Sequence, residues 1–191
     1  MAVRQGKTFD ANNVGLITLQ YQDADLQDTV DVLDCIGVIT TEPTVRTKTK
    51  TCSGATKDEK TYPQYLTVSI TAYVKMEAYR DLMGMHTEGL KEGVYAYGIN
   101  SKSPRMVITA RILDDMANVE KIVAYPNATV TSGLTFTVDN DTDEVPKVDL
   151  QFKAMMDAKG NFYYEADVSD ITDVETWESN FTPALVEKAG A

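Results

Sequence analysis

Apolar and polar residues alternate with a period of two through much of this chain, and this pattern constrains its fold more than any other feature. The clearest case runs from Tyr65 to Val74, where every second residue is apolar. Such alternation is typical of a half-buried β-strand. Similar patterns predict strands over 106–112, 119–125, 134–138, 148–156 and 162–166, and we expect earlier strands over 14–21 and 29–40. The turn sequence Asp157–Gly160 predicts that the last two strands form a β-hairpin.

Only one segment has the period of an amphipathic helix. It runs from Lys75 to Met85, where Met76, Tyr79 and Leu82 fall on one side. One helix cannot supply the crossovers that parallel strands need, so we expect antiparallel sheets. The predicted fold is therefore mainly β: an antiparallel β-sandwich or small barrel over residues 11–168, with the helix over an edge or open end. Residues 1–10 and 169–191 are expected to form N- and C-terminal arms.

The charge balance excludes one class of function. The chain has 191 residues with a formal net charge of −11, and such an acidic surface repels a phosphate backbone. No apolar run is long enough to span a membrane, and the N-terminus has no apolar signal region, so we expect a chain made and kept in a cytosol. In that reducing compartment Cys35 and Cys52 are expected to be free thiols.

A basic segment interrupts this acidic chain. Residues 43–62 carry five cations and two acids, a local charge of +3, and the alternation of Thr and Lys favours an extended two-stranded arm over a compact loop. A polar stretch of this length between strands indicates a function or disorder. The cations are Arg46, Lys48, Lys50, Lys57 and Lys60.

The C-terminal part of the chain has the opposite character. From Asp139 onward there are thirteen acids and four lysines, a net charge of −9. The last residues, from Ser169, show no sustained period but include Trp177, Phe181 and Leu185. A lone tryptophan in a polar arm suggests docking on another surface, and we assign these three residues that role.

Catalysis and metal binding have little support in the sequence. His86 is expected at the helix end, where it can interact with unpaired carbonyls, and no nucleophile motif accompanies it. The acidic run 139–144 matches the start of a calcium loop, but Glu144 replaces the required glycine and Leu150 the final bidentate glutamate. Zinc ligands and glycine-rich phosphate loops are lacking too, so we expect no enzyme, metal or cofactor.

The aromatic residues favour self-assembly. The methionines suit core filling, but the ten tyrosines are too many for one small core and are a residue type favoured at interfaces. All but one of the ten lie from the end of the basic segment to the start of the C-terminal tail, at Tyr62, Tyr65, Tyr73, Tyr79, Tyr95, Tyr97, Tyr125, Tyr163 and Tyr164.

The order of these features resembles the major tail tube proteins of long-tailed bacteriophages that infect Gram-positive hosts. The resemblance rests on the lead Met1–Asp10, the strand pair with its arm at 43–62, and the strand-then-helix unit Tyr65–Met85. The strand 121–128 and the expected finishing hairpin Asp149–Ala166 add to it.

This resemblance implies a structural virion protein that is assembled in the host cytoplasm. Subunits would form hexameric rings that stack into a tube through which DNA passes without being held, with tape-measure, tail-tip and terminator proteins as partners. Residues 44–62, 1–10 and 170–191 would make contacts between subunits, and the basic segment would meet an acidic surface of the next ring. Two alternatives stay open: the tube subunit of a contractile tail or secretion system, and a β-sandwich module that binds carbohydrate or a receptor.

Overall fold

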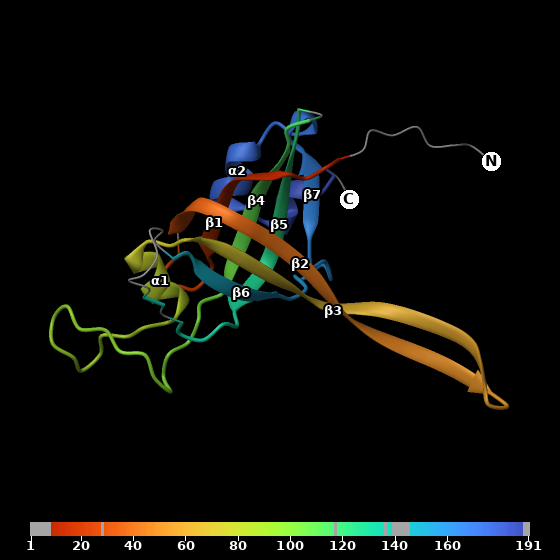
Figure 1. Ribbon diagram of the computed structural model, residues 1–191, viewed down its shortest axis with the longest axis horizontal. Coiled ribbons are helices and arrows are strands. Elements are labelled where there is room, and N and C mark those ends of the chain that lie inside the picture. Colours follow the sequence, from red (N-terminus) through yellow and green to blue (C-terminus); the bar gives the residue numbers. More distant parts are fainter. Residues whose placement is uncertain (1–8, 28, 117, 136, 139–145, 189–191) are drawn as a thin grey trace.

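The fold is a closed antiparallel β-barrel from which one long hairpin projects (Figure 1). The computed structural model describes residues 9–27, 29–116, 118–135, 137–138 and 146–188. Its elements are β1 (Asn13–Tyr21), β2 (Val30–Cys52), β3 (Ala55–Tyr73), α1 (Met76–Leu82), β4 (Met106–Asp114), β5 (Val119–Val130), β6 (Val148–Ala154), β7 (Tyr164–Asp167), η1 (Val168–Asp170), α2 (Val174–Asn180) and η2 (Pro183–Val186).

Six strands close on themselves in the order β4-β1-β2-β3-β6-β5, because β5 also pairs with β4. Every pairing between the strands is antiparallel. The predicted mainly β, antiparallel fold is confirmed, and of its two forms the barrel is the one adopted. Closure satisfies the edge strands that an open sheet would expose.

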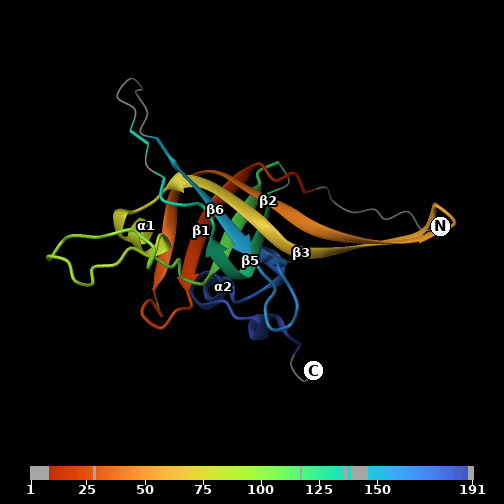
Figure 2. The same ribbon diagram turned by 90° about the horizontal axis from the view of Figure 1, so that it is seen from below.

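The barrel interior is filled by the apolar residues of the alternating strands. Ile17, Ile70, Ile108 and Phe152 come from four different strands and are fully buried in one cluster. Leu82 and Met83 join the same cluster, so α1 packs its apolar side against the barrel interior. This helix lies at one end of the barrel in both views (Figures 1 and 2). The strands predicted over 14–21 and 106–112 correspond to β1 and β4.

Two predictions about strands are wrong. Residues 134–138 form no strand where they are described, because the Tyr79 hydroxyl contacts the Thr135 backbone instead. It accepts a hydrogen bond from the Thr135 amide at 3.0 Å and lies 2.6 Å from its carbonyl oxygen. The predicted hairpin of 148–156 with 162–166 does not form either. The end of β6, Phe152–Ala154, already pairs with β3 on one edge and β5 on the other, so β7 pairs with β5.

Gly84, and not His86, ends the helix predicted over 75–85. The Met85 amide donates to the Arg80 carbonyl at 2.9 Å and the Gly84 amide to that of Asp81 at 2.9 Å, with Gly84 at φ 62°. This is a Schellman motif, which satisfies the last helix carbonyls. His86 lies beyond it and pairs its backbone with Ala96. The expected interaction of His86 with the helix end is therefore wrong.

Replacing Gly84 by alanine is expected to destabilise the fold strongly. A β-carbon there would lie 2.1 Å from the Lys102 carbonyl oxygen. The left-handed conformation costs about 1–2 kcal/mol for a residue with a β-carbon, and overpacking adds about 1–3 kcal/mol. Gly89→Ala is the matched control, because Gly89 has φ +73° with nothing within 4 Å. Urea unfolding should show a larger loss for Gly84→Ala; equal losses would contradict the steric explanation.

Candidate functional site

The most distinctive surface is the projecting end of the β2–β3 hairpin, residues 45–63, which we call the arm. From the pair Val45–Pro63 to the pair Cys52–Ala55, each strand pairs only with the other. Ser53 and Gly54 form the tip with φ 52° and 77°, as the twisted two-residue turns of hairpins require. Every residue of the arm is exposed. The predicted extended two-stranded form of this segment is thus present (Figure 1).

The register places most of the arm's cations on one face. Lys48 lies opposite Lys60, Arg46 opposite Tyr62 and Lys50 opposite Asp58. The other face carries Thr47 and Thr61, whose hydroxyls are 3.2 Å apart. Like charges directly opposite each other destabilise a strand pair. Within the described part of the chain, none of these cations has a carboxylate in ion-pair range. The basic face is therefore available to an anionic partner.

The outer edges of the arm are also unpaired. The pairing of β2 with β1 ends at Leu33, and the pairing of β3 with β6 begins at Leu66. In the described residues, no strand borders the arm on either side. Unpaired strand edges are templates for pairing with another chain. The arm thus combines a basic face with two open edges.

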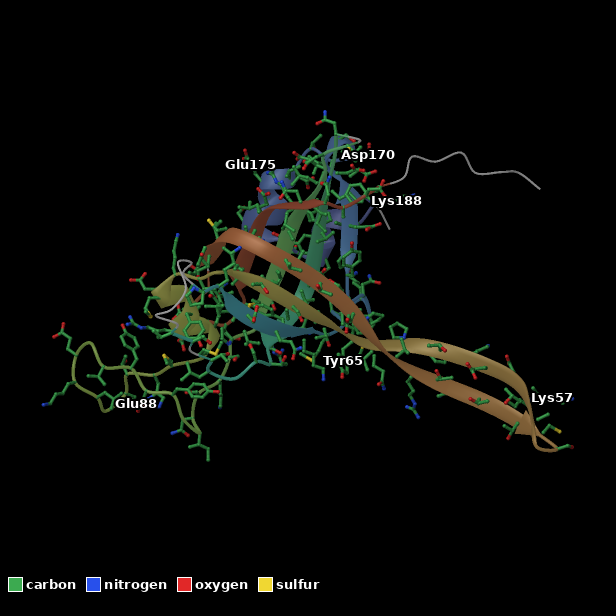
Figure 3. The ribbon with its side chains drawn as sticks, in the orientation of Figure 1. Lys57, Tyr65, Glu88, Asp170, Glu175 and Lys188 are labelled. Atoms are coloured by element: carbon green, nitrogen blue, oxygen red, sulfur yellow. The ribbon has the colours of Figure 1, made fainter. Side chains whose placement is uncertain are left out.

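An acidic surface lies away from the arm, on β7, η1 and α2. Figure 3 shows Asp170 and Glu175 there, far from Lys57 at the arm tip. Glu178 of α2 forms an ion pair with Arg111, and a second hydrogen bond of 2.9 Å joins Arg111 Nη2 to Glu178 Oε2. The hydrogen bond to Glu178 raises the pKa of the Arg111 guanidinium. Burial lowers this pKa, but by less than the hydrogen bond raises it. The remaining acids of this surface are Glu165, Asp167, Asp170, Asp173 and Glu175.

The C-terminal aromatic residues pack on their own barrel. Trp177 and Phe181 are 2 % and 3 % exposed and contact each other with ring centroids 4.7 Å apart, over Val107 and Ile122. Leu185 packs partly against the same cluster. The C-terminal segment, described to residue 188, is therefore not a free arm. The prediction that it docks on another surface is wrong, because it packs on the outer face of β4 and β5 in its own subunit.

Gln20 explains why this segment stays in place. Its amide donates to the Trp177 carbonyl at 2.7 Å and accepts from the Phe181 amide at 2.7 Å, both buried. These bonds satisfy polar backbone groups that would otherwise be buried unpaired, at a cost of about 1–3 kcal/mol each. Figure 2 shows α2 on one side of the barrel.

A largely apolar groove lies at the root of the arm. It encloses about 540 Å³ and is lined by side chains of β2, β3, β5 and the turn before β7, including Thr41, Leu66 and Tyr163. Tyr125 is one of its lining residues; burial raises the pKa of this phenol, and a 2.6 Å hydrogen bond joins its hydroxyl to that of Thr41. The Tyr163 ring packs 5.5 Å from that of Tyr125.

The turn that forms one wall of this groove depends on Asp157. Burial raises the pKa of this carboxyl, but hydrogen bonds from the Tyr164 hydroxyl and from the backbone amides of Asn161, Lys159 and Gly160 lower it below its ordinary value overall. Asp157 therefore stabilises the fold above pH about 4, and the contribution disappears as the pH falls through the lowered pKa.

The stability lost in Asp157→Asn is expected to depend on pH. The variant loses the charge that these donors contact, so it should be less stable than the unmodified protein near pH ~7. The difference should shrink as the pH falls toward ~2–3, where both proteins are uncharged at this position. Urea midpoints measured over this range test it. A difference that is constant with pH would contradict the role of the charge.

The long loop between α1 and β4, residues 83–105, is a surface that sequence reasoning missed. Its side chains include five exposed apolar or aromatic residues, and Ile99 is 100 % exposed. Tyr95 and Tyr97 stood out as tyrosines, but only the absence of strand or helix period over this stretch could have indicated a loop. The exposed residues are Leu90, Val94, Tyr95, Tyr97 and Ile99.

The cysteines and the possible metal ligands form no further site among the described residues. Cys35 and Cys52 are both exposed free thiols at opposite ends of β2. Among the residues that the structure describes, no His, Cys, Asp or Glu side chains cluster as metal ligands, and no helix is long and apolar enough to cross a membrane. The acidic run 139–144 and residues 1–8 lie outside the described residues.

Comparison with known proteins adds no family assignment. No protein-family model matches the chain, and the curated proteins contain no significant match.

Proposed function

We propose that this chain is a structural subunit that self-assembles into the tail tube of a long-tailed bacteriophage, as stacked hexameric rings without catalytic activity. The observation that supports it most is the arm: a fully exposed hairpin with a basic face and two open edges. The second support is the order of features along the sequence, which resembles that of tail tube proteins. Tape-measure, tail-tip and terminator proteins would be its other partners.

The arm has no evident role within one subunit. Isolated two-stranded hairpins are only marginally stable in water, and the arm buries none of its side chains. Ordering such a segment costs conformational entropy, about 1–2 kcal/mol per residue, which contacts with another molecule can offset. A partner copy provides both a strand edge to pair with and an acidic surface to meet the cations.

Charge distribution suits stacking of identical subunits. The arm's basic face and the acidic surface around Asp170 and Glu175 lie on different parts of one molecule (Figure 3). A contact between two different surfaces of identical chains is heterologous, and it closes into rings or continues as a filament. Complementary charge across such a contact orients the subunits and speeds their association.

The net negative charge of the chain suits the inner wall of a tube through which DNA moves. With a net charge of −11, most of the surface repels phosphates, so a genome moving through the tube would not be retained. A tube subunit of a contractile tail or secretion system would share these features.

A binding module is the second candidate, and the groove at the arm root favours it. Its volume of about 540 Å³ lies within the range of small-ligand sites, roughly 300–1,000 Å³. The partly exposed Tyr163 ring, backed by the buried Tyr125, would then be the face against which a sugar ring stacks. Saturable binding of a glycan by a protein that stays monomeric would support this function over a tube.

Electron microscopy of the purified protein tests the proposal. At high concentration, or with a tail-tip initiator added, we expect six-fold rings and hollow tubes. A protein that sediments as a monomer under both conditions would contradict the proposal. Raised salt should weaken assembly, because screening reduces the attraction between exposed charges.

A further inference from the structure

β7 presents an open strand edge besides those of the arm. It is the last strand in the sheet order, and among the described residues it pairs with β5 alone. The arm extends beyond the barrel that carries β7 (Figures 1 and 2), and there each of its strands pairs only with the other. An unpaired edge can accept a strand of another chain. Both edges are therefore left for a strand of another molecule.

The side chains of β7 give its edge a negative charge. Glu165 and Asp167 are two residues apart and share one face of the strand, whereas Tyr164 and Ala166 pack on the α2 side. Residues 164–188 contain seven acids and one lysine, a net charge of −6. Charges on an edge strand hinder indiscriminate pairing, so this edge favours a basic strand.

The cations near β7 do not neutralise its two carboxylates. Lys121 lies opposite Asp167 on β5, but its ammonium lies 4.5 Å from the centre of the Phe9 ring. Lys159, in the turn before β7, forms an ion pair with Glu187 instead. Within the part of the chain that the structure describes, neither carboxylate of β7 takes part in an ion pair. Both are thus available to cations of a partner.

Of the arm's two edges, that of β2 complements β7 better. Residues 45–52 contain three cations and no acid, whereas residues 55–63 contain two lysines and two acids. Lys48 and Lys50 are two residues apart on the basic face, the same spacing as the two acids of β7. Alternate residues of a strand lie about 6.6–6.8 Å apart, so two pairs of opposite charge can form side by side.

We infer that the β2 edge of the arm pairs antiparallel with the outer edge of β7 in a second copy, with Lys48 opposite Asp167 and Lys50 opposite Glu165. Antiparallel pairing is slightly more stable per residue than parallel pairing. The inference rests on the proposed self-assembly and specifies which strands meet. Because the two edges are different surfaces, each copy offers its arm to one neighbour and its β7 to another. The contact therefore repeats along the assembly.

Paired charge reversals test the inference through assembly. Lys48→Glu with Lys50→Glu should raise the protein concentration needed for tubes about tenfold or more, because two attractive pairs become repulsive. Glu165→Lys with Asp167→Lys should have the same effect. The protein that carries all four substitutions should assemble like the unmodified protein, because the charges are again opposite.

The matched control reverses two acids of the same surface that lie outside β7. Asp170→Lys with Glu175→Lys should not restore assembly of the arm variant. Restoration by this control, or no restoration by the β7 reversal at an unchanged urea midpoint, would overturn the inference. The β7 reversal also removes the 2.8 Å hydrogen bond that Glu165 accepts from the Tyr163 hydroxyl, so a second test keeps both acids.

Disulfide trapping tests the same contact without relying on tubes. Starting from a protein with Cys35→Ser and Cys52→Ser, one variant carries Thr49→Cys and another Ala166→Cys, the positions between the two charge pairs. Mixed and oxidised, the two should form a heterodimer in excess over either homodimer. Thr176→Cys is the matched control, because Thr176 is exposed on α2, on the acidic surface but outside β7. An equal yield with the control would overturn the inference.

The outcomes separate the two proposals. Tubes from the unmodified protein, with no restoration by the β7 reversal and no specific cross-link, would overturn this inference and leave the proposed function standing. A specific cross-link in a protein that never forms tubes would support the strand contact and contradict the proposed function. A monomer without cross-links would overturn both.

Discussion

Shortening the arm is expected to abolish tube formation and leave the stability of the barrel unchanged. The variant lacks residues 46–60 and carries Thr61→Asn and Tyr62→Gly, so that Asn-Gly joins the paired residues Val45 and Pro63. Asn-Gly is the favoured two-residue hairpin turn. The removed residues are all exposed and outside both core clusters, so the urea midpoint should stay the same. Electron microscopy should show dispersed subunits and no tubes.

A second variant separates the charge of the arm from its length. Arg46→Gln, Lys48→Gln, Lys50→Gln and Lys60→Gln keep the hairpin but remove its basic face. We expect weaker assembly that added salt no longer weakens further, because the attraction between the arm's cations and an acidic surface, which salt screens, has been removed. Tubes of normal length from the shortened protein would refute the assigned role of the arm. Normal, salt-dependent assembly of the glutamine variant would refute only the role of its charge.

Trp177→Ala is expected to lower the free energy of unfolding by about 3–5 kcal/mol, the cost of removing a large buried aromatic side chain. The lost contacts are those with Phe181 and with the outer face of β4 and β5. The loss should expose Val107 and Ile122 beneath α2 as well. Urea unfolding followed by circular dichroism measures the change.

Glu175→Ala on the same helix is the matched control. Glu175 is exposed, so its removal should change stability by no more than about 0.5 kcal/mol. Trp177 is the chain's one tryptophan, so its fluorescence in the unmodified protein reports whether the C-terminal segment leaves the barrel before global unfolding. A loss below about 1 kcal/mol for Trp177→Ala would show that the segment contributes little to the fold.

The strands and the arm were largely predictable because their signals are local. Alternation over Tyr65–Val74 depends only on neighbouring residues, and it corresponds to the buried half of β3. The arm was predictable for the same reason, because Thr and Lys alternate along it. The structure adds its tip, where Ser53 and Gly54 adopt the positive φ that a tight hairpin needs. The partner of the arm is not encoded in this way, and that role stays a proposal.

The errors concern segments whose structure depends on distant residues. Residues 134–138 have a strand's alternation, but the Tyr79 hydroxyl takes the hydrogen bonds of Thr135. The alternation over 162–166 gave no indication that β5, rather than β6, would be its partner. The exposed loop after α1 likewise follows from what the barrel leaves uncovered. Periodicity predicts which face of a sheet a residue occupies. It does not predict which of several available strands will pair with the segment.

By itself, the sequence determined a mainly β, antiparallel chain with a helix after its clearest strand, a basic hairpin and an acidic remainder, since each of these depends on residue type and short-range spacing. The expectation of a single helix was wrong, because α2 forms in the C-terminal segment, where no sustained period indicated it. Only the tertiary structure decided that the sheet closes through β4 and β5 and that Trp177 is buried in its own subunit. The hydrogen bonds between Gln20 and the backbones of Trp177 and Phe181 join residues 157 and 161 positions apart. Contacts of that range form only when the whole barrel has brought their partners together.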